Sequence, residues 1–363
     1  MKKFLFLSAL LLISACLYAQ SVKDYGFETV KANPITSIKD QHNSGTCWCF
    51  ATTSFLESEA IRINNIPDST LYPDFSEMFT LYRSYADRAV KYLRMDGKLT
   101  SGPGSIAPDL LHVVADYGIV PDSAMPCKTG LPELFGMDKE IRTYLGKVLK
   151  EMTDNPDSRQ VRKWRKDFGK ILSKELGECP ETFKVGDKEY TPAGYRDALG
   201  LRPDDYVTLS SFTHHPFYTS FALEVPDNWR WDSVWNIPLD ELELCVTSAL
   251  EKGYTVAWGS DISEPGYTWD GLAVVPEKEV SQELRQEYFD YKKTVDDHMM
   301  HIFGLARSKR GELFYMVKNS SGPNWGDPNH IWYASIPFFR GKTLYVTIHK
   351  DALPQCVSSK ILK

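Results

Sequence analysis

The chain has 363 residues and a net charge of −6, and 42% of its residues are apolar while 25% are charged. These proportions exclude a collagen, a coiled coil and a wholly disordered chain, and the length allows two ordinary domains or one large domain in two parts. The mild acidity also argues against a nucleic-acid-binding protein, because such proteins carry a clustered basic face.

The N-terminus has the pattern of an export signal. A basic start is followed by an apolar run over residues 4–13, which is too short to span a bilayer. Cleavage after Ala19 would remove residues 1–19 as a signal peptide. Alternatively, residues 13–16 resemble a bacterial lipobox, in which Cys16 would carry a lipid anchor and become the first mature residue. We expect an exported protein, periplasmic or extracellular, and both processing routes stay open.

The cysteines point to a free thiol and not to a scaffold of disulfides. Seven cysteines in a chain of this length are too sparse for a disulfide-stapled fold. No two of them are spaced as CxxC, which excludes zinc-ribbon and thioredoxin patterns. The cysteine that we expect to remain a functional free thiol is Cys47.

The first half of the chain is predicted to be mainly helical. Residues 20–46 show no regular pattern. A helix is predicted to begin at Cys47 and to end at the stop signal of residues 64–67, because apolar residues recur every three or four positions. A second helix is predicted over residues 108–117. Residues 138–178 mix charged and apolar positions, which predicts two amphipathic helices with solvated faces in preference to a charged partner surface.

The second half is predicted to be rich in strands. A third helix over residues 238–252 precedes a buried strand at 255–259. Short strand patterns then cluster at residues 301–305, 314–317, 331–333 and 344–348. Because helices come first and strands last, we predict an α+β protein whose helical and sheet parts face each other across a cleft.

Cys47 has the surroundings that a nucleophile needs. A catalytic thiol requires a lowered pKa, a base, and donors for an oxyanion. Cys47 lies where a helix begins, and the helix dipole favours a thiolate there. Gln41 precedes it by six residues and carries an amide that can donate to an oxyanion. On its own, however, a cysteine at a helix start is more often a small buried apolar residue.

His298 is the candidate base, and Asn319 is the candidate partner that orients it. His298 stands directly before the strand cluster, and the Asn319 carbonyl can fix the imidazole tautomer. His298 and His301 resemble a metal pair, but in a strand they would point to opposite faces, and no further cluster completes a zinc site. We therefore expect no metal and no cofactor. His214 and His215 are assigned a structural role.

The order of these residues resembles the papain-like cysteine peptidases. A long separation between Cys47 and His298 narrows the resemblance to the bleomycin hydrolase/aminopeptidase C branch, over roughly residues 35–354. The stretches that carry it are Gln41 to Phe50, Trp235 to Asp240, Gly253 to Gly259, Asp296 to His301, Asn319-Ser320-x-Gly322 and His349 to Pro354.

The resemblance implies a papain-like α+β fold in one peptidase domain over residues 20–363. A helical left half, residues 20–135, would carry the nucleophile. A mainly helical insertion would cover residues 136–235, and a sheet-rich right half, residues 236–363, would carry the histidine and the asparagine. The cleft would lie between the two halves.

The resemblance also implies roles for single residues. Cys47 would be the nucleophile, His298 the acid/base, Asn319 its orienter and Gln41 the oxyanion donor in peptide-bond hydrolysis. Residues 101–105 match the loop whose backbone pairs with extended substrate. The expected substrate-binding residues are therefore Gly104, Ser105 and Trp48.

The partners that follow are peptide substrates and no nucleic acid. The resemblance also implies that a homo-oligomer can form. A membrane would be contacted only through a lipid anchor at Cys16.

Two departures from the family pattern matter. Ser321 replaces the tryptophan that shields the His–Asn hydrogen bond, which keeps a second hypothesis open, a catalytically weak relative that binds peptides. The few residues after Pro354 carry two lysines, whereas the aminopeptidase branch uses a longer C-terminal arm to block the cleft beyond the substrate's amino terminus. We therefore expect looser amino-terminal selectivity than in the aminopeptidases, with some endopeptidase action.

Overall fold

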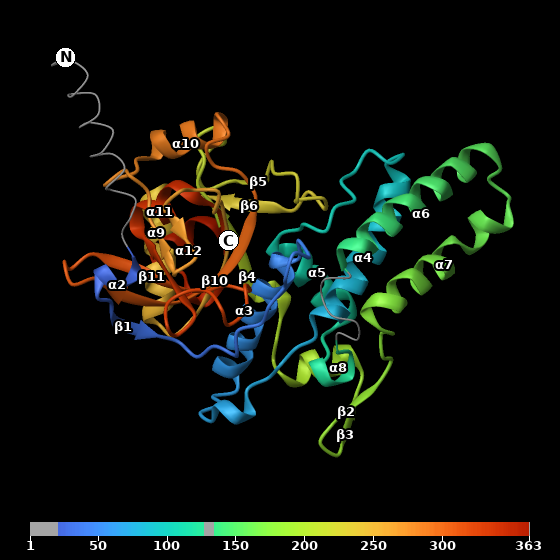
Figure 1. Ribbon diagram of the computed structural model, residues 1–363, viewed down its shortest axis with the longest axis horizontal. Coiled ribbons are helices and arrows are strands. Elements are labelled where there is room, and N and C mark those ends of the chain that lie inside the picture. The colour runs from blue at the N-terminus through green and yellow to red at the C-terminus, as the bar shows by residue number, and fades with distance from the viewer. Residues whose placement is uncertain (1–20, 127–133, 363) are drawn as a thin grey trace, which may run out of the picture.

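The computed structural model describes residues 21–126 and 134–362. The strands gather on one side of the molecule and helices α4 to α8 on the other, with α3 between them (Figure 1). This arrangement confirms the expected α+β fold with a helical and a sheet-rich part. No helix of the described residues is both long and apolar enough to cross a membrane. The expected signal segment 1–19, with the lipobox at Cys16, lies outside the described residues.

Helix α3 (Cys47–Ile63) is the centre of the helical part and matches the first predicted helix. It packs on strands of the sheet on one side and on helices α4 (Glu77–Arg94) and α5 (Ala107–Tyr117) on the other. Because both sides are covered, almost every side chain of α3 is buried, including several polar ones. The predicted second helix at 108–117 corresponds to α5.

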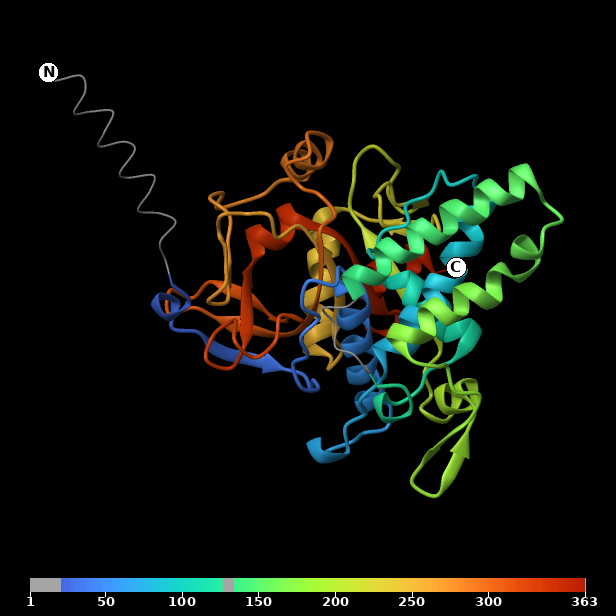
Figure 2. The same ribbon diagram turned by 45° about the vertical axis from the view of Figure 1, so that its right-hand side comes forward.

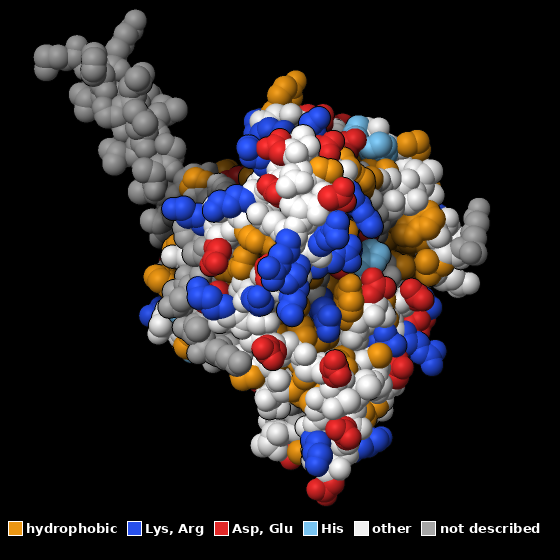
Figure 3. All heavy atoms as spheres, turned by 90° about the vertical axis from the view of Figure 1, so that its right-hand side faces the viewer, with side chains coloured by type: hydrophobic (Ala, Val, Ile, Leu, Met, Phe, Trp, Pro, Cys, Tyr) orange, Lys and Arg blue, Asp and Glu red, His pale blue; other side chains and the backbone are white. Residues whose placement is uncertain are grey.

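The charged segment 138–178 forms the hairpin of α6 (Leu134–Asp154) and α7 (Arg159–Leu176), as predicted. The hairpin extends away from the sheet (Figures 1 and 2). Lysine and arginine side chains are spread over the face that these helices present, together with acidic ones (Figure 3). The short elements that accompany this region are β2 (Phe183–Val185), β3 (Lys188–Tyr190) and α8 (Pro192–Ala198).

Eleven strands of the described residues form one sheet. Its order is β5-β6-β4-β13-β7-β10-β11-β12-β9-β8, and β1 (Glu28–Ala32), which follows the short α2 (Val22–Tyr25), pairs with β10. The other strands are β4 (Tyr206–Ser210), β5 (Ser220–Ala222), β6 (Ser233–Asn236), β7 (Val256–Ser260), β8 (Tyr267–Thr268), β9 (Leu272–Ala273), β10 (His298–Arg307), β11 (Leu313–Lys318), β12 (Ile331–Ser335) and β13 (Thr343–His349).

The segment expected to be a mainly helical insertion, 136–235, contains most of α6, all of α7 and α8, and also strands. Strands β4, β5 and most of β6 belong to this segment and extend the large sheet beyond β13. The pairing of β4 with β13 is antiparallel over Tyr206–Leu209, so non-local hydrogen bonds decide the structure here. The division into halves at 135 and 235 stays a prediction, and the sheet crosses the second boundary.

Helices α9 (Leu239–Glu251) and α12 (Gln355–Ile361) cover the sheet face opposite to α3. Neighbouring residues of β7 show this, because Ala257 packs in the apolar cluster that includes α3, whereas Trp258 packs with α9 and α12. Two further helices, α10 (Gln282–Asp290) and α11 (Ile336–Lys342), complete the sheet-rich part.

The sheet brings His298 and Asn319 together. Strand β10 begins at His298, and β11 ends at Lys318, directly before Asn319. The two strands are antiparallel neighbours, with His301 opposite Lys318. The start of one strand and the end of the other therefore lie at the same edge of the sheet, next to the N-terminal end of α3.

Candidate active site

His298 and Asn319 are joined by a hydrogen bond of 2.8 Å between Nε2 and Oδ1. The backbone N–H of Ser320, which can only donate, also bonds Oδ1 of Asn319 at 2.8 Å. The other end of the amide, Nδ2, donates to the Tyr267 hydroxyl at 2.8 Å. These contacts fix which end of the amide faces the imidazole. Nε2 of His298 is therefore the protonated nitrogen, and Nδ1 carries the lone pair.

Gln41 is held by Ser320 from two sides. The backbone N–H of Gln41 donates to the Ser320 carbonyl at 2.8 Å, and the Ser320 hydroxyl donates to Oε1 of Gln41 at 2.5 Å. Since Oε1 is occupied, the amide nitrogen of this buried side chain is the end that remains as a donor. The structure thus brings the expected oxyanion donor and the expected His–Asn pair into one hydrogen-bonded unit.

Cys47 is the first residue of α3, as its expected role requires. Burial, with smaller contributions from the carboxylates of Asp227 and Asp296, raises the pKa of its thiol to about 12. The peptide N–H groups of Met299 and Trp48 lie close enough to the sulfur to lower the pKa. Met299 directly follows His298, so the start of β10 lies against the thiol. At neutral pH the resting form is the thiol, not the thiolate.

His298 is neutral in this environment. Burial lowers the pKa of its imidazole, and the bond to Asn319 offsets only part of this shift. His301 lies on the other face of β10, where its Nδ1 lies 3.0 Å from the Ser54 hydroxyl on α3. The expectation that the two histidines diverge is therefore met, and they do not form a metal pair.

The expected substrate loop at residues 101–105 is anchored from behind. Trp48 is only 1% exposed, and its indole N–H donates to the Pro103 carbonyl at 2.9 Å. The Arg88 guanidinium binds the carbonyls of Gly102 and Gly104, the second at 2.6 Å. Trp48 therefore supports the loop and does not offer its ring to a peptide.

Ser105 faces away from the cleft as well. Its hydroxyl donates to the buried carboxylate of Asp109 at 2.8 Å and receives the indole N–H of Trp229 at 3.0 Å. Of the three residues expected to bind substrate, Gly104 alone has its main chain partly exposed, and Asp227 packs against it.

Tyr267 provides part of the shielding that the family's tryptophan gives at the position of Ser321. Its ring is buried and stacks on Trp332, and its hydroxyl accepts a hydrogen bond from the Asn319 amide. Ser321 instead forms an isolated bridge with Asp40, and its hydroxyl is buried without a partner among the described residues. An aromatic residue from β8 thus covers the Asn319 side of the pair.

Four residues near the site were not predicted from the sequence to have a function. Ser320 and Tyr267 orient the expected machinery, and Asp227 and Asp296 present carboxylates to Cys47. Asp296 was visible two positions before His298 in the sequence. The other three act through contacts between distant segments, for which the sequence has no local signal.

In one group of described residues, the side-chain nitrogen and oxygen atoms lie close enough together to bind a metal ion. It consists of His214, His215 and Glu224, with Nε2 of His214 3.1 Å from the Glu224 carboxylate. Nδ1 of His214 accepts a hydrogen bond of 2.9 Å from the Gln286 amide. Both ring nitrogens of this histidine therefore have hydrogen-bond partners, consistent with the structural role expected for it.

Comparisons with known proteins agree with this architecture. The model of the Peptidase C1-like family matches residues 78–363, a region that contains His298 and Asn319 but begins after Gln41 and Cys47. Aminopeptidase G of Lactobacillus delbrueckii subsp. lactis is 24% identical over 88% of this chain and 82% of its own length. Aminopeptidase C of Lactococcus lactis subsp. cremoris is 21% identical over 93% of this chain and 85% of its own.

The fold has a solved counterpart. The crystal structure of pepw from Lactobacillus rhamnosis HN001 superposes with a TM-score of 0.71 at 18% identity, over 92% of this chain and 84% of that one. This likeness concerns the fold and supports the papain-like arrangement. The resemblance to the aminopeptidase C branch is confirmed by these relatives. The chain belongs to the Peptidase C1-like family and is a cysteine-type peptidase.

Proposed function

We propose that this protein hydrolyses peptide bonds through Cys47, His298 and Asn319, with Gln41 as an oxyanion donor. The observation that carries the proposal is the hydrogen bond between His298 Nε2 and Asn319 Oδ1, with the amide held in one orientation by Ser320 and Tyr267. It leaves Nδ1 of the imidazole as a base at the edge of the sheet where Cys47 begins α3.

In the proposed reaction, Nδ1 of His298 takes the thiol proton as the Cys47 sulfur bonds to the substrate carbonyl carbon. Removal of this proton belongs to the reaction, because the high pKa of the buried thiol disfavours a resting thiolate. The carbonyl oxygen becomes an oxyanion, to which the Gln41 amide donates. The carbon–nitrogen bond then breaks, and the leaving amine takes the proton from the imidazolium.

Hydrolysis of the acyl-enzyme uses the same groups. A water molecule gives a proton to Nδ1 of His298 while its oxygen bonds to the acyl carbon. The carbon–sulfur bond then breaks, and the sulfur recovers the proton from the imidazolium. Throughout, the Asn319 carbonyl holds the imidazole in its tautomer and stabilises the imidazolium.

We further propose an aminopeptidase-like action, because the relatives that span most of this chain are named aminopeptidases. An alternative is a peptide-binding protein with weak catalysis. The high pKa of Cys47 is the observation that favours this alternative, because it makes the resting nucleophile weak.

The deciding experiment compares the wild-type protein with Cys47→Ala. The wild type should cleave short peptides and should be labelled at Cys47 by an epoxide thiol inhibitor. Cys47→Ala should lose cleavage and labelling but keep its fold and its affinity for peptides. Cleavage by Cys47→Ala at the wild-type rate would reject the nucleophile and point to Cys49. Peptide binding without any cleavage by the wild type would favour the binding protein.

A further inference from the structure

An acidic side chain stands in the expected substrate path. The carboxylate of Asp227 packs against Gly104, so that a Cβ placed on Gly104 would lie only 2.0 Å from its Oδ2. The carbonyl of Gly104 meanwhile points to Arg88. A peptide strand cannot run along Gly104 without displacing the carboxylate. Asp227 therefore fills the space beside Gly104 by its volume as well as by its charge.

A second carboxylate lies beside the first. The peptide N–H of Asp227 lies near the Asp296 side chain. Burial, and after it the Asp227 carboxylate, raise the pKa of Asp296 to about 8. Oδ2 of Asp296 is buried and has no hydrogen-bond partner among the described residues. An acceptor without a donor in a buried position is costly unless a ligand supplies the donor.

Neither carboxylate is neutralised by an ion pair with any residue that the structure describes. Burial raises the pKa of Asp227, and the nearby Arg88 offsets only part of this shift, since its guanidinium also binds the loop carbonyls. Asp227 packs on Gly104 in the loop that Trp48, next to Cys47, anchors, and Asp296 lies two residues before His298. Both carboxylates also raise the pKa of the Cys47 thiol. The acidic pair is thus open to a further cation next to the nucleophile.

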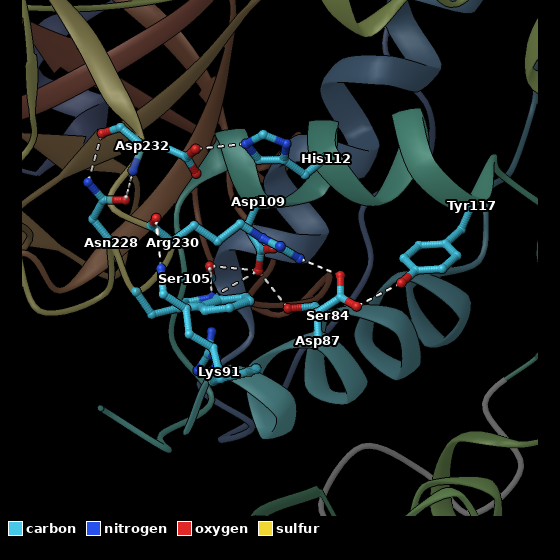
Figure 4. A network of polar contacts seen from close by, with 12 residues as sticks. Ser84, Asp87, Lys91, Ser105, Asp109, His112, Tyr117, Asn228, Arg230 and Asp232 are labelled. Carbon is cyan, nitrogen blue, oxygen red and sulfur yellow. Dashed lines mark hydrogen bonds and ion pairs between the residues drawn. The ribbon is translucent and has the colours of Figure 1, made fainter. Parts of the chain in front are cut away.

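The residues that follow Asp227 are anchored by polar contacts, which include those of Asn228 and Arg230 (Figure 4). Directly after it, the Trp229 indole donates to Asp109 at 3.1 Å, and the Arg230 guanidinium bonds Asp109 at 2.5 Å and Asp87 at 2.7 Å. Asp109 and Asp87 belong to α5 and α4. Asn228 closes the turn by donating to the carbonyls of Leu223 and Asp232, both at 2.9 Å. Asp227 is therefore held in place before any ligand binds.

We propose that Asp227 and Asp296 form a subsite that binds the α-ammonium group of a peptide's first residue. The inference rests on the proposed function. In an amino-terminal residue, the ammonium nitrogen is two bonds, about 2.5 Å, from the carbonyl carbon, and each further residue adds at most about 3.6 Å. A carboxylate pair next to Cys47 therefore selects one of the first two peptide bonds for cleavage.

The described C-terminal helix does not compete for this position. Val357 and Ile361 of α12 are buried with α9 on the sheet face opposite to α3, and Lys360 pairs with Glu241 of α9 at 2.7 Å. The expectation of loose amino-terminal selectivity was based only on the residues after Pro354. The acidic pair supplies a receptor for the ammonium from another part of the chain.

The test uses a neutral heptapeptide and its N-acetylated form with the full-length protein. The wild type should cleave the free peptide after residue one or two, with kcat/KM at least about 10-fold above that of the acetylated form. Asp227→Asn and Asp296→Asn should each lower kcat/KM for the free peptide about 10-fold or more, mainly through KM, because a charged hydrogen bond is lost. Cleavage of the acetylated peptide should not fall.

Glu224→Gln serves as the matched control, since it removes one exposed carboxylate from the same segment. Rates are expressed per Cys47 labelled by the epoxide thiol inhibitor, with the labelled residue identified by peptide mass because Cys356 is also a free, exposed thiol. Equal cleavage of both peptides by the wild type would overturn the subsite and leave the peptidase intact. A double Asn variant that keeps the wild-type preference would overturn it as well. Absence of any Cys47-dependent cleavage would overturn the proposed function, and the subsite with it.

Discussion

The hydroxyl of Ser320 donates a hydrogen bond of 2.5 Å to Oε1 of Gln41. The backbone N–H of the same serine bonds the side chain of Asn319. One residue therefore sets the orientation of the expected oxyanion donor and of the residue that holds His298. Gln41 and Asn319 belong to segments that are far apart in the sequence, and Ser320 contacts both side chains.

Ser320→Ala should lower kcat about 10-fold with little change in KM, because the Gln41 amide loses the contact that directs it. Gln41→Ala should lower kcat about 10² to 10³-fold, as loss of one oxyanion donor does elsewhere. The double variant should be little worse than Gln41→Ala, since the two residues act as a unit. Steady-state kinetics with Ser359→Ala, an exposed serine on α12, as control would check this. Additive losses would mean that Ser320 acts separately from Gln41.

Tyr267→Phe should weaken the hold on Asn319. The substitution leaves the buried Nδ2 of Asn319 without its acceptor, at a cost of about 1–3 kcal/mol. We expect kcat to fall about 10-fold and the midpoint of thermal unfolding to decrease. Tyr291→Phe is the control, because Tyr291 is exposed. A lower unfolding midpoint with unchanged kcat would show that Tyr267 supports the fold only.

Alkylation of Cys47 should depend on pH as its raised pKa requires. Because the pKa is about 12, mainly through burial, the thiolate fraction of the free protein should rise about tenfold per pH unit between pH 7 and 10. The rate of iodoacetamide modification measures this fraction. Asp227 and Asp296 face the thiol and raise its pKa, while the N–H groups of Met299 and Trp48 lower it.

Asp296→Asn removes one of these negative charges and should therefore lower the pKa of Cys47 and speed its alkylation at about pH 9.5, where Asp296, with its pKa of about 8, is ionised in the wild type. Iodoacetate, which is anionic, should react more slowly than iodoacetamide with the wild type, and the variant should narrow this difference. Glu224→Gln should change neither rate. A rate that is already constant below pH 8 would contradict the raised pKa.

Asp109→Asn should destabilise the wall of the cleft. Asp109 is 1% exposed and accepts hydrogen bonds from Ser84, Trp229 and Arg230. Removal of its charge leaves Arg230 with Asp87 alone, and breaking a buried pair in this way costs about 3–5 kcal/mol. The free energy of unfolding in urea would measure the loss. Asp87→Asn should cost less, because Asp87 is more exposed, and equal losses would contradict the assigned importance of burial.

The fold was predictable where periodicity is strong and contacts are local. Helices α3, α5 and α9 and strands β7 and β10 to β13 follow apolar patterns and end at glycine or proline signals. Helix α4 has an equally clear amphipathic pattern and could have been predicted. Strands β4 to β6 could not, because they have only three to five residues each and depend on non-local pairing: β4 pairs with β13, far along the chain, and β6 and β5 add to β4 in turn.

The same contrast applies to the site. Gln41, Cys47, His298 and Asn319 could be proposed from their order, since each stands at a recognisable helix or strand boundary. The approach of Asp227 to Gly104 joins positions separated by 123 residues (227 − 104) through two irregular segments. No local pattern specifies such a contact. The residues proposed to determine specificity are thus harder to predict from the sequence than the residues proposed to carry out the chemistry.

Strand β13 lies between β4 and β7 near the middle of the sheet, although it is the last strand of the chain. During synthesis, β7 and β4 therefore keep unpaired edges until residues 343–349 emerge, and such edges invite aggregation. Cys47 is made early, but the sheet that carries His298 is completed only when residues 343–349 have been made. A nascent chain that stops before residue 343 would thus hold the thiol of Cys47 without the completed sheet around the proposed base.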